Sequence, residues 1–179
     1  MPPSDYFFEK LETKAGLNYI LRAQEKVPEG GMYIKPHMHL EHEIMWFYKA
    51  RGSYSIGREK FALQNNTLVY VSPLTLHDME LDFTADHERF ILQYDHTALS
   101  NLKYPVPALE SHTGVVSCLE EKDAERLQFI FKWFSEVNET AYSEKEIKPL
   151  MILLLSTVLQ HAENATKIAT ETDHQSIFA

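Results

Sequence analysis

The sequence predicts a mainly β fold followed by two α-helices. From about Leu17 to Tyr94, short apolar or alternating runs rich in Tyr, Phe, Val and Ile are separated by Gly, Pro and Asn-Asn breaks, a pattern typical of a sandwich or small barrel. Beyond residue 107 the hydrophobic period changes from two to about 3.6, which indicates helices. The chain has 179 residues, 44% of them hydrophobic, so we expect one well-packed core.

Eight strands are expected in the first part of the chain: Tyr19–Ala23, Met32–Met38, Glu43–Ala50, Gly52–Ile56, Lys60–Leu63, Thr67–Val71, His77–Leu81 and Phe90–Tyr94. The first helix is expected to begin near Ser117 and Glu120, which have the spacing of a capping box. The second helix runs to about His161. It begins at either residue 144 or residue 149, because a second capping-box match precedes Pro149, which itself fits a first helical turn.

The second helix is apolar on more than one face. Residues 151–155 are all apolar and point around most of the helix, so it needs two partners. Ile152, Leu155 and Leu159 form a stripe that is either buried within the chain or meets the same stripe of another subunit. The second alternative makes these three residues a candidate homodimer interface.

Charge and composition exclude several classes of function. Lys and Arg total 17 against 26 Asp and Glu, a net charge of −9, which argues against direct binding to nucleic acid or anionic membranes. The single cysteine, Cys118, cannot form an internal disulfide, and no signal peptide opens the sequence. The longest apolar stretch, Leu150–Leu159, is shorter than the roughly 20 residues of a membrane-spanning helix. We therefore expect a cytoplasmic protein without a membrane partner.

Three histidines and a glutamate form a candidate metal or ligand site. His37 and His39 alternate at strand spacing, so both imidazoles can enter one cavity, with Glu43 joining them after a bend and His77 facing them from another strand. Three nitrogens and one carboxylate suit a divalent transition metal such as Mn, Fe, Co, Ni or Zn. The alternative is a hydrogen-bonded polar cluster without metal. His42 is expected at the surface or the rim.

Strand parity divides the residues that follow the histidines. Glu43, Met45 and Phe47 share one face, which we assign to the interior, whereas Ile44 and Trp46 share the face that could lie under the helices. The resulting pocket is part polar and part aromatic, which suits a small organic ligand. The candidate ligand-binding residues are His37, His39, Glu43, Met45, Phe47 and His77.

These residues resemble two motifs of the cupin family. Gly31-x5-His37-x-His39-x3-Glu43, then Gly52, then Pro73-x3-His77 is similar to the two signature motifs of that family, whose metal ligands are two His and a Glu from the first motif and one His from the second. The second motif lacks a glycine between Pro73 and His77 and is one residue shorter, which leaves the direction of His77 open. With the two trailing helices, residues 15–165 resemble the N-terminal effector-binding and dimerisation domain of AraC-type transcriptional regulators.

The resemblance implies a cupin-like double-stranded β-helix, or jelly-roll barrel, followed by two α-helices. It implies a barrel with an N-terminal arm over residues 1–110, a helical dimerisation segment over 111–165 and a linker or tail over 166–179. Tyr6, Phe7 and Phe8 of the arm could close over the effector. The chain would then be a sensor rather than an enzyme, would bind a small-molecule effector inside the barrel without requiring a metal, and would form a homodimer.

The resemblance also implies that DNA is contacted only through a C-terminal helix-turn-helix domain, which is missing from this sequence, so the chain is expected to be part of a longer regulator. Two other functions remain open. One is a metal-dependent cupin enzyme, an oxygenase or isomerase, that holds its ion with His37, His39, Glu43 and His77. The other is a stand-alone metabolite-binding cupin.

Overall fold

A computed structural model describes residues 10–26, 31–83, 85–102, 113–140, 144–162 and 166–168. The strands are β1 (Glu12–Lys14), β2 (Leu17–Lys26), β3 (Met32–His37), β4 (His42–Lys49), β5 (Gly52–Ile56), β6 (Glu59–Leu63), β7 (Thr67–Val71), β8 (His77–Leu81), β9 (Glu88–Tyr94), β10 (Gly114–Cys118) and β11 (Thr166–Ile168). The helices are α1 (His96–Leu102), α3 (Glu121–Glu139) and α4 (Glu144–Ala162).

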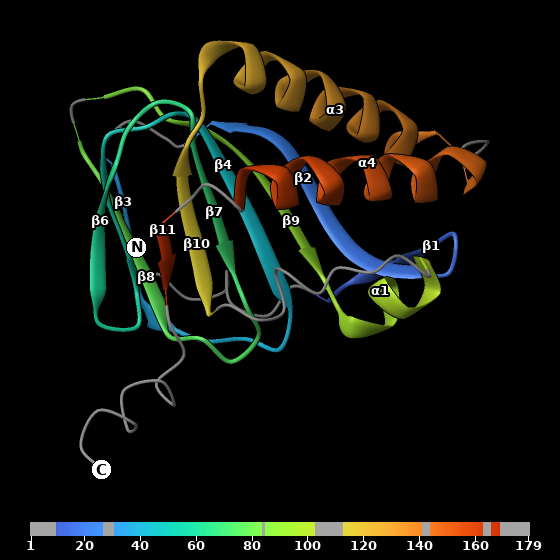
Figure 1. The fold of residues 1–179 in the computed structure, drawn as a ribbon, viewed down its shortest axis with the longest axis horizontal. Coiled ribbons are helices and arrows are strands. Elements are labelled where there is room, and N and C mark those ends of the chain that lie inside the picture. Colours follow the sequence, from blue (N-terminus) through green and yellow to red (C-terminus); the bar gives the residue numbers. More distant parts are fainter. Residues whose placement is uncertain are drawn as a thin grey trace.

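The strands form two antiparallel sheets, and the two long helices cover the larger one (Figure 1). The large sheet has the order β1-β2-β9-β4-β7-β10-β11, and the small sheet has the order β3-β8-β5-β6. Consecutive strands such as β3 and β4 lie in different sheets, as in a jelly roll. The predicted fold class, mainly β with C-terminal helices, is confirmed.

Strand β4 lies between β7 and β9 and separates two apolar cores. Ile44 and Trp46 belong to the core beneath the helices, where the Trp46 ring stacks on Phe131 of α3 with centroids 6.1 Å apart. Met45 and Phe47 belong to the core between the two sheets. The alternation expected for this strand therefore holds.

The sequence did not indicate β10, and the capping box assigned to Ser117 is wrong. Ser117 lies in β10 and pairs with Leu68 of β7, while α3 begins at Glu121 after an N-cap residue that makes no side-chain capping bond. Pairing with β7 extends the sheet, and this tertiary gain outweighs the local capping preference. The second helix begins at Glu144, the earlier of the two expected starts.

Two further short elements, α1 and β1, were not expected, and β11 places residues 166–168 of the expected linker on the sheet beside β10. The remainder of that segment lies outside the described residues, and so does the N-terminal arm with Tyr6, Phe7 and Phe8. Within the described parts of the chain, no helix combines the length and apolar character needed to cross a membrane.

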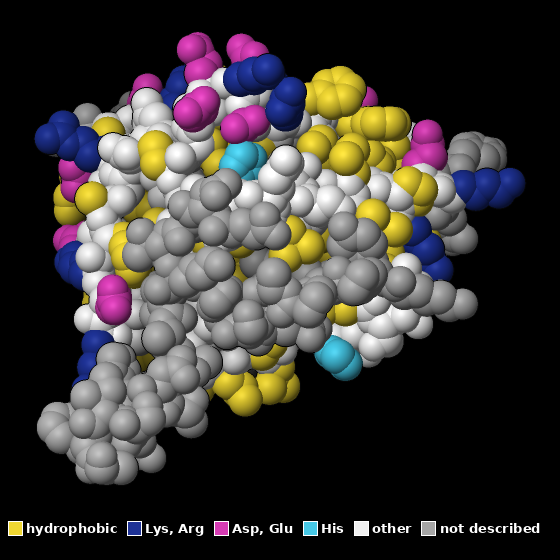
Figure 2. All heavy atoms as spheres, in the orientation of Figure 1, with side chains coloured by type: hydrophobic (Ala, Val, Ile, Leu, Met, Phe, Trp, Pro, Cys, Tyr) yellow, Lys and Arg dark blue, Asp and Glu magenta, His cyan; other side chains and the backbone are white. Residues whose placement is uncertain are grey.

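The stripe of α4 proposed for a homodimer faces the interior. Leu155 is fully buried in the helix-side core, and Ile152 and Leu159 pack against that core as partly buried residues. Within one chain the stripe thus packs mainly inward, as in the first alternative, with Ile152 and Leu159 only partly buried. The exposed large apolar side chains of the described helix pair are Phe129, Trp133 and Leu153. Figure 2 shows hydrophobic side chains gathered on this face of the molecule over the helices.

Candidate functional site

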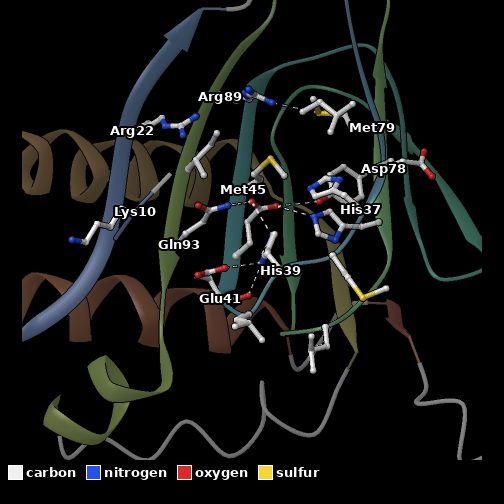
Figure 3. Close-up of a pocket in the computed structure, with 18 residues that line it drawn as sticks. Lys10, Arg22, His37, His39, Glu41, Met45, Asp78, Met79, Arg89 and Gln93 are labelled. Atoms are coloured by element: carbon white, nitrogen blue, oxygen red, sulfur yellow. Dashed lines mark hydrogen bonds and ion pairs between the residues drawn. The ribbon is translucent and has the colours of Figure 1, made fainter. Parts of the chain in front are cut away.

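A cavity of about 410 Å³ opens between the two sheets (Figure 3). Its volume falls in the range of small-molecule sites. The apolar part of the lining consists of Ile34, Met38, Leu40, Met45, Leu74, Met79 and Ile91. Five polar side chains gather in one region of the cavity, namely His37, His39, Glu43, His77 and Gln93, and charged side chains, Arg22 and Arg89 among them, line it elsewhere. The cavity therefore has both the apolar walls and the few polar groups that a small organic ligand requires.

Three histidines converge at this polar region from three segments. His37 ends β3, His77 begins β8, and the two residues pair across the small sheet with ring centroids 4.1 Å apart. The β3–β8 register shifts by one residue between Ile34 and His37, so this irregularity turns His37 toward the cavity face that Ile34 already occupies. His39 lies in the connection that crosses to β4, and its carbonyl accepts a hydrogen bond from the Leu74 amide at 2.7 Å.

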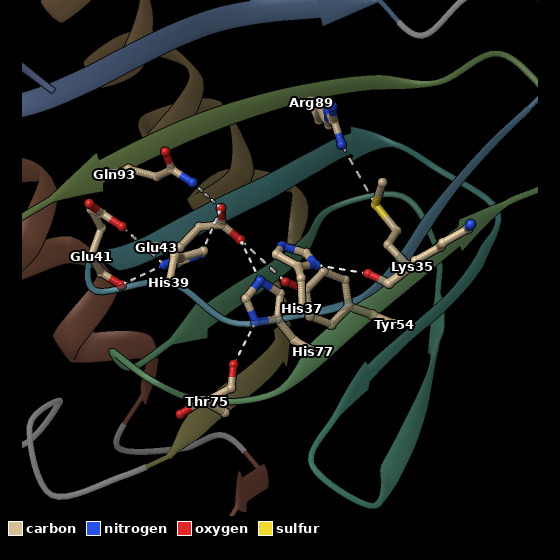
Figure 4. A network of polar contacts seen from close by, with 11 residues as sticks. Lys35, His37, His39, Glu41, Glu43, Tyr54, Thr75, His77, Arg89 and Gln93 are labelled. Atoms are coloured by element: carbon tan, nitrogen blue, oxygen red, sulfur yellow. Dashed lines mark hydrogen bonds and ion pairs between the residues drawn. The ribbon is translucent and has the colours of Figure 1, made fainter. Parts of the chain in front are cut away.

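Each of these imidazoles is oriented by a backbone carbonyl two residues away (Figure 4). The Nδ1 atoms of His37, His39 and His77 lie 2.9, 2.9 and 2.8 Å from the carbonyls of residues 35, 41 and 75. Because a carbonyl only accepts, each Nδ1 carries a proton and the neutral ring keeps its lone pair on Nε2. The Nε2 atoms of His39 and His77 are buried and have no hydrogen-bond partner among the described residues.

Glu43 on β4 faces the two Nε2 atoms from the opposite sheet. Its carboxylate lies 3.6 Å from Nε2 of His39 and 3.7 Å from Nε2 of His77. It accepts hydrogen bonds from Gln93 at 2.6 Å and from the Tyr54 hydroxyl at 3.3 Å. Burial raises the pKa of Glu43, but the facing His39 and His77 imidazoles and the Gln93 hydrogen bond outweigh it and lower the pKa to about 2. The carboxylate is therefore a permanent negative charge inside the cavity.

The three histidines differ in how readily they take a proton. Burial lowers the pKa of His77 to about 4 and also lowers the pKa of His37, despite the attraction of Glu43. Burial lowers the pKa of His39 too, but Glu43 and Glu41 more than compensate, so its pKa is raised above 6.5. A proton that enters the cluster therefore goes to His39.

The cluster fits a divalent transition-metal ion. Ligand atoms of His37, His39 and His77 all lie within 4.8 Å of one another, and the Glu43 carboxylate adds an oxygen and a negative charge. Nδ1–H bonds to carbonyls, with Nε2 directed at a common point, are the outer-shell arrangement of metal-binding histidines. The residues predicted as metal ligands are thus brought together, His77 included, although the shortened second motif left its direction open.

The other predicted site residues are divided between the cavity and the core. Met45 lines the cavity, whereas Phe47 points to the same side of β4 but is fully buried in the core between the sheets, where its ring contacts Tyr54. The prediction of His42 as a surface or rim residue is wrong. Its ring is buried and stacked on Tyr94 with centroids 4.9 Å apart.

Sequence reasoning missed three polar cavity residues on β2 and β9 and the carboxylate that pairs with two of them. Arg22, Arg89 and Gln93 line the cavity, and Glu25 pairs with both arginines. Charged residues beside a predicted sheet strand, such as Glu88 and Arg89 directly before the apolar residues 90–92, are the signal that could have drawn attention to this region.

No family model matches the sequence, and no curated protein has a detectably similar sequence. Similarity appears at the level of solved structures. The AraC-like transcriptional activator CuxR superimposes with a TM-score of 0.58 at 12% identity, over 88% of this chain and 55% of CuxR. ToxT from Vibrio cholerae, solved with an unsaturated fatty acid bound, superimposes with a TM-score of 0.52 at 11% identity, over 93% of this chain and 61% of ToxT.

These similarities cover most of this chain but only part of the other proteins. The chain spans a little over half the length of CuxR and of ToxT, at 55% and 61%. At such low identity the superpositions establish a common architecture. The chain therefore has the fold of part of the AraC-like transcriptional activator CuxR and of part of ToxT.

Proposed function

We propose that this chain is the effector-sensing and dimerisation part of an AraC-type transcriptional regulator, and that it binds a small organic molecule in the cavity between its sheets. The observation that carries the proposal is the cavity itself, with apolar walls and a group of oriented polar side chains at one place. The fold shared with CuxR supports a regulator rather than an enzyme. The fatty acid bound to ToxT supports an organic effector for a protein of this fold.

Strand β4 supplies a route from the cavity to the helices. Met45 lines the cavity, and the next residue, Trp46, packs beneath α3. A ligand that contacts the cavity more favourably in one arrangement of the helices shifts the population toward that arrangement. The effect on DNA passes through a separate basic domain, in keeping with the charge of −9 on this chain.

The first experiment is to read the coding frame beyond Ala179. Two basic helix-turn-helix patterns are expected. A frame that stops at Ala179 would contradict the regulator and leave a stand-alone metabolite-binding cupin.

The second experiment screens a metabolite library for compounds that raise the melting temperature of the chain. Met45→Trp, which fills the cavity, should abolish the stabilisation by each hit. Phe83→Trp, an exposed position outside the cavity lining, is the control and should leave it unchanged. Stabilisation that survives Met45→Trp would show that the ligand binds elsewhere.

We place the homodimer contact on the exposed face of the helix pair, through Phe129, Trp133 and Leu153. The Phe129 and Trp133 rings lie 5.8 Å apart. Phe129 and Leu153 line a groove together with charges of both signs, Lys122 and Glu125 among them. A two-fold contact pairs such a mixed surface with itself. Sedimentation equilibrium should give a dimer that Trp133→Glu converts to a monomer. The same change at another exposed aromatic residue outside this face, Phe83→Glu, should leave the dimer intact.

A metal-dependent cupin enzyme is the second candidate, because the Nε2 atoms of His39 and His77 are buried without a hydrogen-bond partner among the described residues. A divalent ion held by His37, His39, His77 and Glu43 would polarise an oxygen of a bound substrate. Stoichiometric metal in the purified chain, lost in His39→Ala, is the expected result for this candidate. A chain without metal that Mn, Fe, Co, Ni and Zn ions all fail to stabilise would exclude it.

A further inference from the structure

A β-bulge in β2 brings two charged side chains to the cavity face. Arg22 pairs with Ile91 of β9 and Glu25 pairs with Arg89, so the register shifts by one residue between Arg22 and Glu25. In a regular strand, residues three apart point to opposite faces, and the extra residue places both on one face. Within this bulge Gln24 has a φ of +53°, a conformation that few residues other than glycine adopt. The backbone accepts this strain next to the cavity.

The bulge builds an ion cluster around Arg89. Nε of Arg89 donates to Oε2 of Glu25 at 2.5 Å, and Nη1 of Arg22 lies 3.6 Å from Oε1 of the same carboxylate. The Arg89 side chain is only 3% exposed. Its Nη1 donates to the sulfur of Met79 at 3.7 Å, across the cavity in Figure 3. A thioether is a weak acceptor, so a buried guanidinium directs an N–H at a group that satisfies it poorly.

The ion cluster around Arg89 and the three histidines with Glu43 lie at different ends of the same cavity. Arg89, Ile91 and Gln93 alternate along β9 on the cavity face, and all three line the cavity. Gln93 holds Glu43 at the histidine end. Four residues of strand separate Arg89 from Gln93, which corresponds to about 13 Å. The wall between the two ends is apolar, with Met45 and Ile91 paired on neighbouring strands.

We propose that the cavity ligand is a small organic acid whose carboxylate accepts a hydrogen bond from Nη1 of Arg89, with its apolar body between Met45, Met79 and Ile91. This inference rests on the proposed function, since it names the class of effector that the cavity takes. A carboxylate is the partner that a guanidinium binds most strongly, and the hydrogen bond replaces a weak contact to sulfur. Because Arg89 is buried, the pair forms away from water, where the attraction is poorly screened.

The test compares carboxylic acids with their primary amides, which have the same shape and no charge. Hexanoic, decanoic and 4-phenylbutanoic acids and the three corresponding amides are titrated into the chain by calorimetry at neutral pH. At least one acid should bind about tenfold or more tighter than its amide. Arg89→Met should reduce the affinity for that acid about tenfold or more and leave the affinity for the amide unchanged.

Two further variants separate the binding role of Arg89 from a structural one. Glu25→Gln removes the competing carboxylate and should strengthen acid binding about threefold, a gain that loss of packing cannot produce. Arg51→Met removes a guanidinium whose Nε lies 3.2 Å from Asp82 at the surface, and it should leave the affinities for the acid and the amide unchanged. If Arg89→Met does not fold, the acid-to-amide comparison and Glu25→Gln still decide the question.

Three results overturn the inference. If acids and amides bind equally, and Met45→Trp blocks both, the cavity is a ligand site without carboxylate recognition, and the proposed sensing function stands. If none of these compounds binds, the inference also fails, and the sensing function then depends on the library screen. Tighter acid binding that Arg89→Met leaves untouched would place the carboxylate elsewhere and would likewise refute the assignment to Arg89.

Discussion

The buried pair between His39 and Glu43 leads to a sharp prediction, because His39 has a second carboxylate at the same distance. Glu43 lies 3.6 Å from its Nε2 and Glu41 lies 3.6 Å from its Nδ1, but the Glu43 side chain is 6% exposed and that of Glu41 is 28% exposed. Two unit charges 3.6 Å apart attract by about 4 to 5 kcal/mol at an effective dielectric constant of about 20. An exposed pair contributes about 1 kcal/mol or less.

We therefore expect Glu43→Gln to lower the free energy of unfolding by about 2 to 4 kcal/mol and Glu41→Gln by less than about 1 kcal/mol. The amide at position 43 keeps one oxygen that accepts from Tyr54, and the Gln93 amide can turn its own oxygen toward the new NH2 group, so the loss reports mainly the charge. Urea unfolding in the presence of a chelator measures both values. Histidine NMR should show that the pKa of His39 falls in Glu43→Gln, because burial then dominates.

The pH dependence of the His39–Glu43 pair determines the pH range in which the two variants should be compared. The pKa of His39 is raised on folding, so its contribution is complete below 6.5 and is lost as the pH rises through the raised value. The pKa of Glu43 is lowered, so its contribution is present above 4.5 and is lost as the pH falls toward 2. The effect of Glu43→Gln should be largest between pH 4.5 and 6.5. Equal losses for the two variants, or a Glu43→Gln loss that does not shrink in alkali, would refute this reasoning.

Three further outcomes are expected. A Cβ at Gly52, where φ is +152°, would lie 2.0 Å from a carbonyl oxygen of β8. Gly52→Ala should therefore lower the free energy of unfolding, measured in urea, by more than about 4 kcal/mol. Gly57→Ala, whose added Cβ would have no atom within 4 Å, should lower it by about 1 kcal/mol. Burial lowers the pKa of His42 to about 4, so up to about 3 kcal/mol of stability should be lost between pH 6.5 and 4, and His42→Gln should flatten that slope. Leu155→Ala should cost about 2 to 5 kcal/mol and Lys148→Ala, at an exposed position of the same helix, less than about 1, and equal losses would contradict the burial of Leu155.

Strand alternation made much of the site predictable. The spacing of His37 and His39, the position of Glu43 and the turn before His77 were enough to predict that all four residues meet in one region, although His39 lies in the connection after β3 and not on the strand. The division of β4 into a cavity face and a helix face follows from the same rule.

The parts that alternation could not predict are those in which the chain departs from it. The irregularity before His37 and the bulge at Gln24 each change the parity of a strand, so neither the exact pairing of His37 nor the convergence of Arg22 and Glu25 on Arg89 can be read from spacing. The capping box assigned to Ser117 failed for another reason, because pairing with β7 decides its place, and packing against the core decides the place of Leu155 between the two alternatives that the sequence left open.

The carbonyl contacts of the three imidazoles also bear on the free energy of binding. Each ring is held by the main chain of its own segment, at 2.8 to 2.9 Å, so its direction is set before anything enters the cavity. Ordering a free side chain on binding costs about 0.5 to 1.5 kcal/mol, and these three residues have already lost that freedom in folding. The free energy of binding of a ligand or an ion to the three imidazoles is therefore not reduced by the cost of ordering these side chains, as it would be at a mobile site.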